Sequence, residues 1–311
     1  MANFLGIDTS NYTTSAAVYN SETKEVINCK KLLPVSEGNK GLRQSDAVFL
    51  HTKALPDIVA DALENVDNIQ AVGVSSKPRD IKNSYMPCFL PGYAVASGIS
   101  SANKCNLYEF SHQRGHIAAA IYSAKAFHLF NQKFIAFHIS GGTTDALIIE
   151  PHNDLIIKCN KATSTLDLNA GQVIDRVGVM LGLTFPCGKE LEVLAKKADK
   201  EIKVHPKLKD GFCCLSGVEN QCKKMFESGQ SSENIALYVI NFVCKTVELM
   251  ADVLLEKYGN LPIVFAGGVM SNSIIQEKLK NKYCCYFAKP EFSCDNAAGI
   301  ALLTAIKEGK F

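Results

Sequence analysis

Two stretches decide the fold: FLGIDTSNYTTSAAV at residues 4–18 and FIAFHISGGTTDALI at residues 134–148. Each is an apolar strand, a turn of small hydroxyl-bearing residues and a second apolar strand, which is the pattern of a tight hairpin. Such a turn exposes backbone N–H groups and hydroxyls, the chemistry of a phosphate cradle. Because one copy opens each half of the chain, the pattern predicts a duplicated domain with a nucleotide held between the halves.

Length and charge limit the classes of protein to consider. The chain has 311 residues, enough for two domains that each bury a core. Its net charge of +2 provides no global field that would steer nucleic acid or a membrane to it. A partner of the size of tRNA would need a local basic patch, or a second protein, to contact its phosphates. The candidates for that patch are Lys77, Arg79, Lys82, Lys104 and Arg114.

The beginning of the chain and its cysteines suggest a location. The first three residues lead directly into an apolar strand, so we expect no signal peptide, and no apolar run is long enough to span a bilayer. Twelve cysteines are present without any Cys-x-x-Cys pair, unlike a zinc ribbon or a disulfide framework. We expect reduced, mostly buried thiols in a cytoplasmic protein that does not contact membranes.

Strands and helices alternate along both halves. In the first half we expect, after the hairpin, a strand at 26–33, a helix at about 45–65, a strand at 69–76, a helix at 93–103, a strand at 106–110 and a helix from 111 or 112. Ser45 is the candidate N-cap of the first helix, and Pro56 is expected to kink or interrupt it.

The second half repeats this order. After its hairpin we expect a strand at 155–158, a mostly helical insertion at about 171–230, a helix at 232–258, a strand at 261–266, a helix at 273–281, a strand at 284–288 and a closing helix at 295–307. The alternation predicts an α/β protein with a mixed sheet flanked by helices in each half. We place the domains at 1–130 and 131–311, with the closing segment 295–311 a candidate to pack back on the first domain.

His112 and His116 form the sharpest local signal. Residues four apart lie on one face of a helix, so both imidazoles can reach one metal ion. Gln113 stands where a zinc protease needs a glutamate base, and glutamine cannot take a proton. The alternative is two unrelated surface or capping histidines. A third ligand could be Asp295 or His138, although Asp295 could equally be an N-cap and His138 a packed core residue.

Two other places have the chemistry of a ligand site. Gly267 and Gly268 end an apolar strand, and paired glycines let a base or ribose lie against the backbone; the alternative is an ordinary tight turn. Asp8 ends the first strand and could bind a metal-bound water or a phosphate-linked ion; the alternative is a carboxylate that stabilises the turn. Asp175 and Gly188 carry no signal by themselves.

Taken together, the motifs resemble the tRNA threonylcarbamoyladenosine transferase family, also known as the glycoproteases. This family belongs to the superfamily of actin, sugar kinases and heat-shock ATPases. The resemblance covers nearly the whole chain, and its motifs are LGIDTS at 5–10, HQRGH at 112–116, ISGGTT at 139–144, GQVIDR at 171–176, FPCG at 185–188, AGGVMSN at 266–272 and CDNAA at 294–298.

The resemblance implies a ligand set and a reaction. His112, His116 and Asp295 would bind one divalent metal ion, iron or zinc, with His138 as a further candidate. The adenylate, or ATP or AMP, would contact Ser140, Gly141, Gly142 and Thr143 at its phosphate, and Asp175, Gly188, Gly267, Gly268 and Asn272 at its ribose and base. Asp8 would take part in catalysis. The amine N6 of adenosine 37 in tRNA would attack threonylcarbamoyl-AMP, and AMP would leave; family-type partner proteins are expected.

The chain departs from the family pattern at several acidic positions. Asn11, Tyr12 and Thr13 stand where the family has Cys-Asp-Glu, and Arg114 replaces the glutamate between the metal-binding histidines. Gln172 replaces another glutamate. These departures keep two alternatives open: a carbamoyl-type transferase with another acceptor, and a non-catalytic nucleotide-binding scaffold. An endopeptidase is disfavoured because Gln113 cannot activate water.

Overall fold

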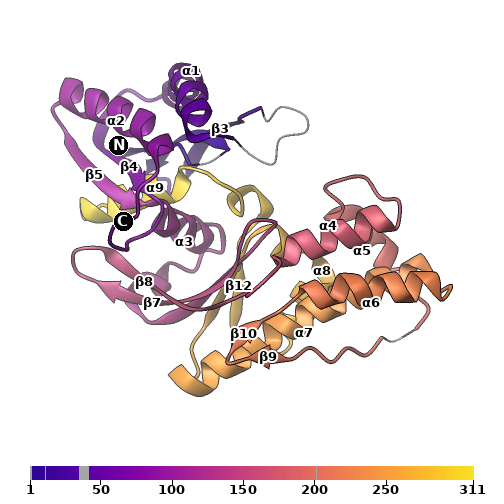
Figure 1. Ribbon diagram of the computed structural model, residues 1–311. Coiled ribbons are helices and arrows are strands. Elements are labelled where there is room, and N and C mark those ends of the chain that lie inside the picture. Colours follow the sequence, from indigo (N-terminus) through magenta and orange to yellow (C-terminus); the bar gives the residue numbers. More distant parts are fainter. Residues whose placement is uncertain (1, 11, 35–41, 201) are drawn as a thin grey trace. The chain divides into compact units, whose positions relative to one another are not determined.

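The computed structural model describes residues 2–10, 12–34, 42–200 and 202–311, so Asn11 lies outside the described residues. The chain divides into two compact units (Figure 1). Unit 1 comprises Met1–Phe130, Pro151–Cys159 and Glu291–Phe311, and unit 2 comprises Asn131–Glu150 and Asn160–Pro290. The predicted domain bounds, 1–130 and 131–311, stay predictions.

Unit 1 is built on a five-stranded mixed sheet. Its strand order is β3 (Val26–Leu32), β2 (Thr13–Asn20), β1 (Asn3–Asp8), β4 (Ile69–Lys77) and β5 (Asn106–Ser111). The central strand β1 is antiparallel to β2, its hairpin partner, and parallel to β4. The helices of the unit are α1 (Gln44–Leu63), α2 (Leu90–Asn103), α3 (His112–Ser123) and α9 (Ala298–Lys307), with short 3₁₀ turns at η1 (Pro87–Phe89), η2 (Phe127–Asn131) and η4 (Pro290–Phe292).

Different helices cover the two faces of this sheet. Side chains alternate between the faces of a strand, and Leu5 and Ile7 of β1 pack in one core with Leu55 of α1. The intervening Gly6 points the other way, because a Cβ atom there would lie 2.4 Å from the backbone nitrogen of Ala301 in α9. Glycine at this position therefore lets α9 lie close against the first strand of the chain.

Unit 2 repeats the architecture. Its sheet has the order β12 (Cys285–Phe287), β11 (Ile263–Ala266), β6 (Phe134–Ile139), β7 (Thr144–His152) and β8 (Ile156–Ser164). The hairpin β6–β7 occupies the place of β1–β2, and β11 is parallel to β6 as β4 is to β1. The same strand order in both sheets confirms the predicted α/β fold of two mixed sheets flanked by helices.

The helices of unit 2 surround a long central helix. They are α4 (Ala170–Met180), α5 (Gly188–Ala195), α6 (Ser216–Glu227), α7 (Ser232–Tyr258) and α8 (Ser273–Lys280), with a 3₁₀ turn η3 (Gly268–Ser271) and a small hairpin of β9 (Leu208–Lys209) and β10 (Phe212–Cys213). α4, α5 and α6 form most of the predicted helical insertion. α7 has the predicted bounds, and its apolar side chains pack in one core with those of α4, α6 and α8.

Several predicted element ends are wrong. The N-cap of α1 is Arg43 rather than Ser45, and the helix continues through Pro56. Burial of Leu55 and Ile58 on either side of this proline holds the helix in place although one backbone hydrogen bond is lost. α9 begins at Ala298, three residues beyond Asp295. Within the described residues, no helix is long and apolar enough to cross a membrane.

Candidate functional site

The two histidines lie on the first turn of α3. Ser111 ends β5 and caps the helix, because its hydroxyl accepts a hydrogen bond from the backbone N–H of Arg114 at 3.3 Å. His112 and His116 then face the same side, with their ring centres 4.3 Å apart. The two rings are therefore neighbours on one side of the helix.

Asp295 approaches both rings from the loop that precedes α9. Its Oδ1 atom lies 3.0 Å from Nε2 of His116 and 3.4 Å from Nε2 of His112. One ligand atom from each of the three residues lies within 4.8 Å of the other two. Asp295 is not the N-cap of α9, which is Ala297. Asn296 satisfies the helix end instead, because its side-chain oxygen accepts the N–H of Ala298 at 3.1 Å.

Asp8 lies behind His112. Its Oδ1 atom is 3.0 Å from Nδ1 of His112, and the carboxylate is fully buried. Ser10 donates a hydrogen bond to its Oδ2 atom at 2.6 Å, and Ser75 donates one to Oδ1. The carboxylate therefore fixes the ring through Nδ1 and leaves Nε2 facing Asp295. This arrangement suits a residue that positions a ligand more than one that contacts a substrate.

The cluster carries a strong local field. Burial works against the protonated form of His112, but the charge of Asp8 and hydrogen bonds to Asp295 and Asp8 raise the pKa of His112 to about 10. Burial also disfavours the ionised form of Asp295, yet hydrogen bonds from both histidines and their charges hold the pKa of that carboxyl far below its usual range. The carboxylates of Asp8 and Asp295 therefore favour the protonated, positively charged form of the His112 ring that lies between them.

The donor set fits a catalytic metal ion. Two imidazole nitrogens and one carboxylate oxygen are the ligands of mononuclear zinc and non-haem iron sites that keep coordination positions open for a substrate. A carboxylate that accepts the other N–H of a ligating histidine, as Asp8 does for His112, is the usual outer partner of such sites.

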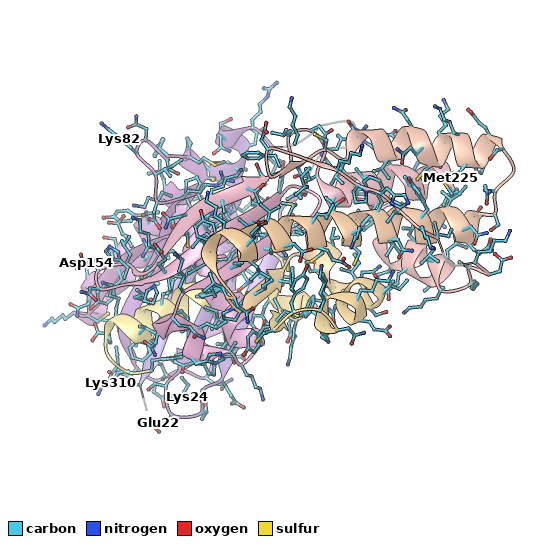
Figure 2. All side chains as sticks on the ribbon, turned by 90° about the horizontal axis from the view of Figure 1, so that it is seen from below. Glu22, Lys24, Lys82, Asp154, Met225 and Lys310 are labelled. Atoms are coloured by element: carbon cyan, nitrogen blue, oxygen red, sulfur yellow. The ribbon has the colours of Figure 1, made fainter. Side chains whose placement is uncertain are left out.

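Arg114 binds outside the cluster of His112, His116 and Asp295. It is 2% exposed, and its Nε and Nη2 atoms donate to the two oxygens of Asp80 at 2.7 and 3.1 Å. Its guanidinium also stacks over Phe110, 5.3 Å from the ring centre. The charge introduced between the histidines is therefore neutralised by Asp80. The prediction that Arg114 contributes to an exposed basic patch is wrong, whereas Lys82 of that set lies at the surface (Figure 2).

The predicted phosphate loop follows β6 in unit 2. The backbone N–H of Ser140 donates to the carbonyl of Thr143 at 2.8 Å, and the Ser140 hydroxyl accepts from the N–H groups of Gly142 and Thr143 at 3.3 and 3.2 Å. A Cβ atom on Gly141 or Gly142 would meet nothing within 4 Å. The loop is a closed turn with an open outer side on which a ligand could lie.

Two other segments contact this loop. Gly171, in the first turn of α4, donates its N–H to the carbonyl of Ser140 at 3.1 Å, and a Cβ atom there would lie 2.6 Å from the nitrogen of Gly141. A Cβ atom on Gly267 would lie 2.2 Å from the carbonyl oxygen of Ile139. The positive end of the α4 dipole and the end of β11 are therefore both close to the loop, an arrangement that favours an anion.

The remaining predicted adenylate residues have structural partners. Asp175 accepts the N–H of Cys187 at 2.9 Å, which ties α4 to the turn that leads into Gly188 and α5. Asn272 caps α8 by accepting the N–H groups of Ile274 and Ile275. Gly268 begins η3, which contacts both α4 and β6. Roles for these residues toward ribose or base stay predictions.

His138 lies on β6 of unit 2, opposite Asp145 on β7. The cluster of His112, His116 and Asp295 belongs to unit 1. The role of His138 as a further metal ligand stays a prediction.

Sequence reasoning missed the partners that hold the cluster. Ser75 lies beside Asp8 only because β1 and β4 are parallel and in register, with Ile7 opposite Val74. Asp80 lies in a loop without periodic pattern, 34 positions before Arg114. A signal did exist for Ser75, since both strands end in small polar residues at the same edge of a sheet.

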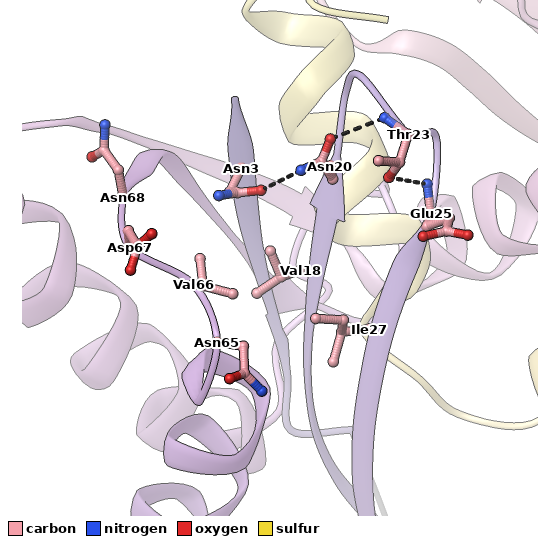
Figure 3. A pocket seen from close by; sticks show the side chains of 10 residues that line it. All are labelled: Asn3, Val18, Asn20, Thr23, Glu25, Ile27, Asn65, Val66, Asp67 and Asn68. Carbon is pink, nitrogen blue, oxygen red and sulfur yellow. Dashed lines mark hydrogen bonds between the residues drawn. The ribbon is translucent and has the colours of Figure 1, made fainter. Parts of the chain in front are cut away.

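A cavity of about 480 Å³ lies elsewhere in unit 1 (Figure 3). Its lining is rich in side-chain amides, with Asn3, Asn20, Asn65 and Asn68 among the lining residues. Asn3 begins β1 and Asp8 ends it, so the cavity is at the opposite end of that strand from the histidine cluster. No sequence motif pointed to it.

The fold is of the type seen in actin-like ATPases and sugar kinases. Component A of (R)-2-hydroxyglutaryl-CoA dehydratase from Acidaminococcus fermentans matches with a TM-score of 0.59 at 16% identity, over 99% of this chain and 100% of that one. A ROK family glucokinase from Streptomyces griseus, solved with glucose and AMPPNP, matches with a TM-score of 0.53 at 11% identity, over 98% of both chains.

Within this class, the sequence belongs to one family. The tRNA N6-adenosine threonylcarbamoyltransferase model matches residues 38–302, so the chain belongs to that family. Its relative in Fervidobacterium nodosum, which carries this name, is 27% identical over 98% of this chain and 94% of its own length. The relative of the same name in Nautilia profundicola is 29% identical over 99% and 94%. The chain is a divergent member, and these relatives are named as transferases.

Proposed function

We propose that this protein transfers the threonylcarbamoyl group of threonylcarbamoyl-AMP to N6 of adenosine 37 in tRNA. The reaction forms a bond between N6 and the carbamoyl carbon and breaks the bond from that carbon to the phosphate oxygen, so that AMP leaves and N6 loses a proton. The names of the relatives support this activity, and so does the match of the family model to most of the chain. The proposal places the protein in the cytoplasm, with tRNA and family-type partner proteins.

One observation carries the proposal: Nε2 of His112, Nε2 of His116 and Oδ1 of Asp295 converge in front of the buried carboxylate of Asp8. A divalent iron or zinc ion held there would polarise the carbamoyl oxygen and stabilise the charge that develops on it. Asp8 would hold the His112 ring in the tautomer that presents Nε2, and Ser10 and Ser75 would keep Asp8 ionised. No side-chain nucleophile is needed.

The leaving group would be bound by unit 2. We assign the phosphate of the adenylate to the loop of Ser140, Gly141, Gly142 and Thr143, where the Ser140 hydroxyl would donate a hydrogen bond and the positive end of the α4 dipole would favour the anion. We assign ribose and base to the surroundings of Gly267 and Gly268, with Asp175 in the middle of α4, Gly188 at the start of α5 and Asn272 at the N-cap of α8.

The test is reconstitution with partner proteins supplied. The full chain, tRNA and threonylcarbamoyl-AMP should yield threonylcarbamoyladenosine, detected by mass spectrometry of the digested nucleosides. His116→Ala should abolish the product and the bound metal, whereas His128→Ala, an exposed histidine on η2, should leave both intact. Wild-type protein that binds metal and AMP yet never modifies adenosine 37 would contradict the proposal.

A second candidate is a transferase of the same chemistry with another acceptor. The observation in its favour is the missing acidic pair after β1, where Thr13 and Thr14 are buried and Thr14 hydrogen-bonds His51 at 2.8 Å. Complementation of a strain that lacks the tRNA-modifying enzyme separates the two. Rescue supports tRNA as the acceptor, and failure of an expressed, folded protein favours another acceptor or a non-catalytic scaffold.

A further inference from the structure

An extended segment of unit 2 presents a row of positive side chains. It has the sequence IKVHPKLK at residues 202–209, and exposure alternates along it with a period of two. The inward residues are Ile202, Val204, Pro206 and Leu208, and the outward, exposed residues are Lys203, His205, Lys207 and Lys209. In Figure 1 the segment runs as an extended loop into β9. We call the four outward residues the basic stripe.

The segment is anchored from its inner side. Val204 and Leu208 pack against the core of unit 2. The side chain of Asn241 on α7 donates to the carbonyl of Ile202 at 3.1 Å, and Lys278 of α8 donates to the oxygen of the same amide at 2.6 Å. At its far end, Lys209 pairs with Phe212 in the β9–β10 hairpin. The outward side chains therefore project from a fixed backbone.

The lysines of the basic stripe do not form ion pairs with described residues of the protein. Among the ion pairs formed by described residues, none uses Lys203, Lys207 or Lys209. By contrast, Lys196 just before the segment pairs with Glu192 at 2.8 Å. No acidic residue interrupts 202–209. The segment is therefore a local positive patch in a chain whose net charge is only +2.

The spacing suits a phosphate backbone. Outward residues of an extended strand are about 6.6 Å apart, so the four span about 20 Å in a line. A nucleic acid strand presents its phosphates as a regular row of negative charges, and lysine binds each as a flexible point charge. The outward face contains no apolar side chain and no Phe, Tyr or Trp, so it lacks the groups that insert into a membrane, and its one ring is the imidazole of His205.

We propose that Lys203, Lys207 and Lys209, with His205 between them, bind the phosphate backbone of the tRNA substrate. The inference rests on the proposed function, since that function makes tRNA the polyanion this protein must hold. Contacts of this kind set the position of the RNA without reading its sequence, so the stripe would orient tRNA while other groups select adenosine 37.

The test compares two triple variants of the full chain. In the first variant, Lys203, Lys207 and Lys209 are each changed to Gln. In the matched control variant, three other exposed lysines, Lys31, Lys53 and Lys158, are each changed to Gln. Binding of fluorescent tRNA is measured between 50 and 300 mM salt. We expect the stripe variant to lose about tenfold or more in affinity near 150 mM salt, and the slope of log K against log salt to fall by about two to three. In the reconstituted assay, KM for tRNA should rise with kcat unchanged.

Each other outcome overturns the inference. Equal affinities and slopes for wild type and stripe variant would exclude the stripe, as would an equal loss in the control. If the stripe variant loses the binding of the wild type to vesicles of anionic lipid but still binds tRNA, the basic stripe contacts a membrane surface instead. If wild type binds no tRNA at 50 mM salt, the stripe proposal is wrong. The proposed function is tested separately, by measuring metal binding, AMP binding and product formation of the same samples. Unchanged thermal unfolding shows that the exposed substitutions leave the fold intact.

Discussion

His112 is held from both sides of its ring, by Asp8 at Nδ1 and Asp295 at Nε2. The nitrogen that would bind a metal ion therefore carries a proton in the metal-free protein. Because the pKa of His112 is raised to about 10, its contribution to stability is present below its usual value of 6.5 and is lost as the pH rises through about 10.

Metal binding should therefore displace a proton from His112. We expect zinc binding at pH 7 to release about one proton and to strengthen by about tenfold for each unit of pH between 6 and 8. Calorimetric titration in two buffers of different ionisation enthalpy counts the protons. The exposed-histidine variant His128→Ala should behave as wild type. An affinity that does not vary over this range would count against the site.

Asp8 should control metal affinity without touching the substrate. Asp8→Asn removes the charge behind His112, and we expect the metal affinity to fall by about 10- to 100-fold. AMP binding, which we assign to unit 2, should not change. Competition with a chromogenic chelator measures the first and fluorescence titration the second. Asp46→Asn on the first turn of α1 is the control, and equal losses in both variants would refute a specific role.

The pair of Arg114 and Asp80 should contribute to stability. Arg114→Met removes the bidentate partner of the half-buried carboxylate of Asp80 and leaves it with Ser111 and Lys77, so we expect a loss of about 1.5–3 kcal/mol at pH 7. Burial raises the pKa of Asp80, but hydrogen bonds from Arg114 and Ser111 lower it below its usual 3.8 overall. The stabilisation is thus present above pH 3.8 and is lost as the pH falls through the lower folded value.

Urea unfolding at pH 7 and at acidic pH tests this pair. The difference between Arg114→Met and wild type should shrink on acidification. Arg176→Met, which breaks an exposed pair with Glu219, should cost less than about 1 kcal/mol. Equal costs for the two substitutions would show that burial of the Arg114 pair does not matter.

At the scale of elements, the two adjacent glycines after β11, Gly267 and Gly268, serve as a test residue and its control. Gly267 has φ +98° and packs against Ile139, whereas Gly268 has open space around it. We expect Gly267→Ala to destabilise the protein by about 1–3 kcal/mol and to weaken AMP binding, because the phosphate loop follows Ile139 directly. Gly268→Ala should be close to neutral in stability. Thermal unfolding with and without AMP distinguishes the two, and identical behaviour would contradict the close approach.

The sequence was sufficient for elements with local signals. The predicted bounds of α7 agree with the observed ones, and the structure shows a local signal at each end, since Ser231 caps the start and Gly259 follows Tyr258. The expected interruption of α1 at Pro56 is absent because burial of Leu55 holds the helix, and α9 begins later than predicted because Asn296 rather than Asp295 accepts the N–H of its first residue. Local sequence patterns do not predict these helix ends and interruptions, because they depend on contacts between residues that are distant in the sequence.

Much of the candidate site depends on distant contacts. The helix spacing of His112 and His116 was readable, but Asp295 was one option among several until the resemblance to a family selected it. Its 3.0 Å approach to His116 spans 179 positions of sequence. The ion pair of Arg114 with Asp80 had no local signal in the sequence either. In the sequence alone, the arginine that replaces the family's glutamate places a positive charge beside the histidines, but in the fold Asp80 neutralises that charge.

For the whole molecule, the two proposed ligands should act on different units. Bound zinc should slow amide exchange in α3 and around residues 291–298, because its ligands join these segments. AMP should slow exchange at 139–143 and at the start of α4. Exchange mass spectrometry with each ligand alone measures both patterns. Protection of α3 by AMP without protection of the phosphate loop would contradict the assignment.

The packing of α9 on β1 has a consequence for synthesis on the ribosome. β1 ends at Asp8 and α9 begins at Ala298, so at 5–20 residues per second the first strand waits roughly 15–60 s for its covering helix. The same closing segment carries Asp295. A chain released early therefore lacks both the cover of its first sheet and one of the three proposed metal ligands. Such a fragment exposes apolar surface to chaperones and proteases, and it cannot compete with the finished protein for metal.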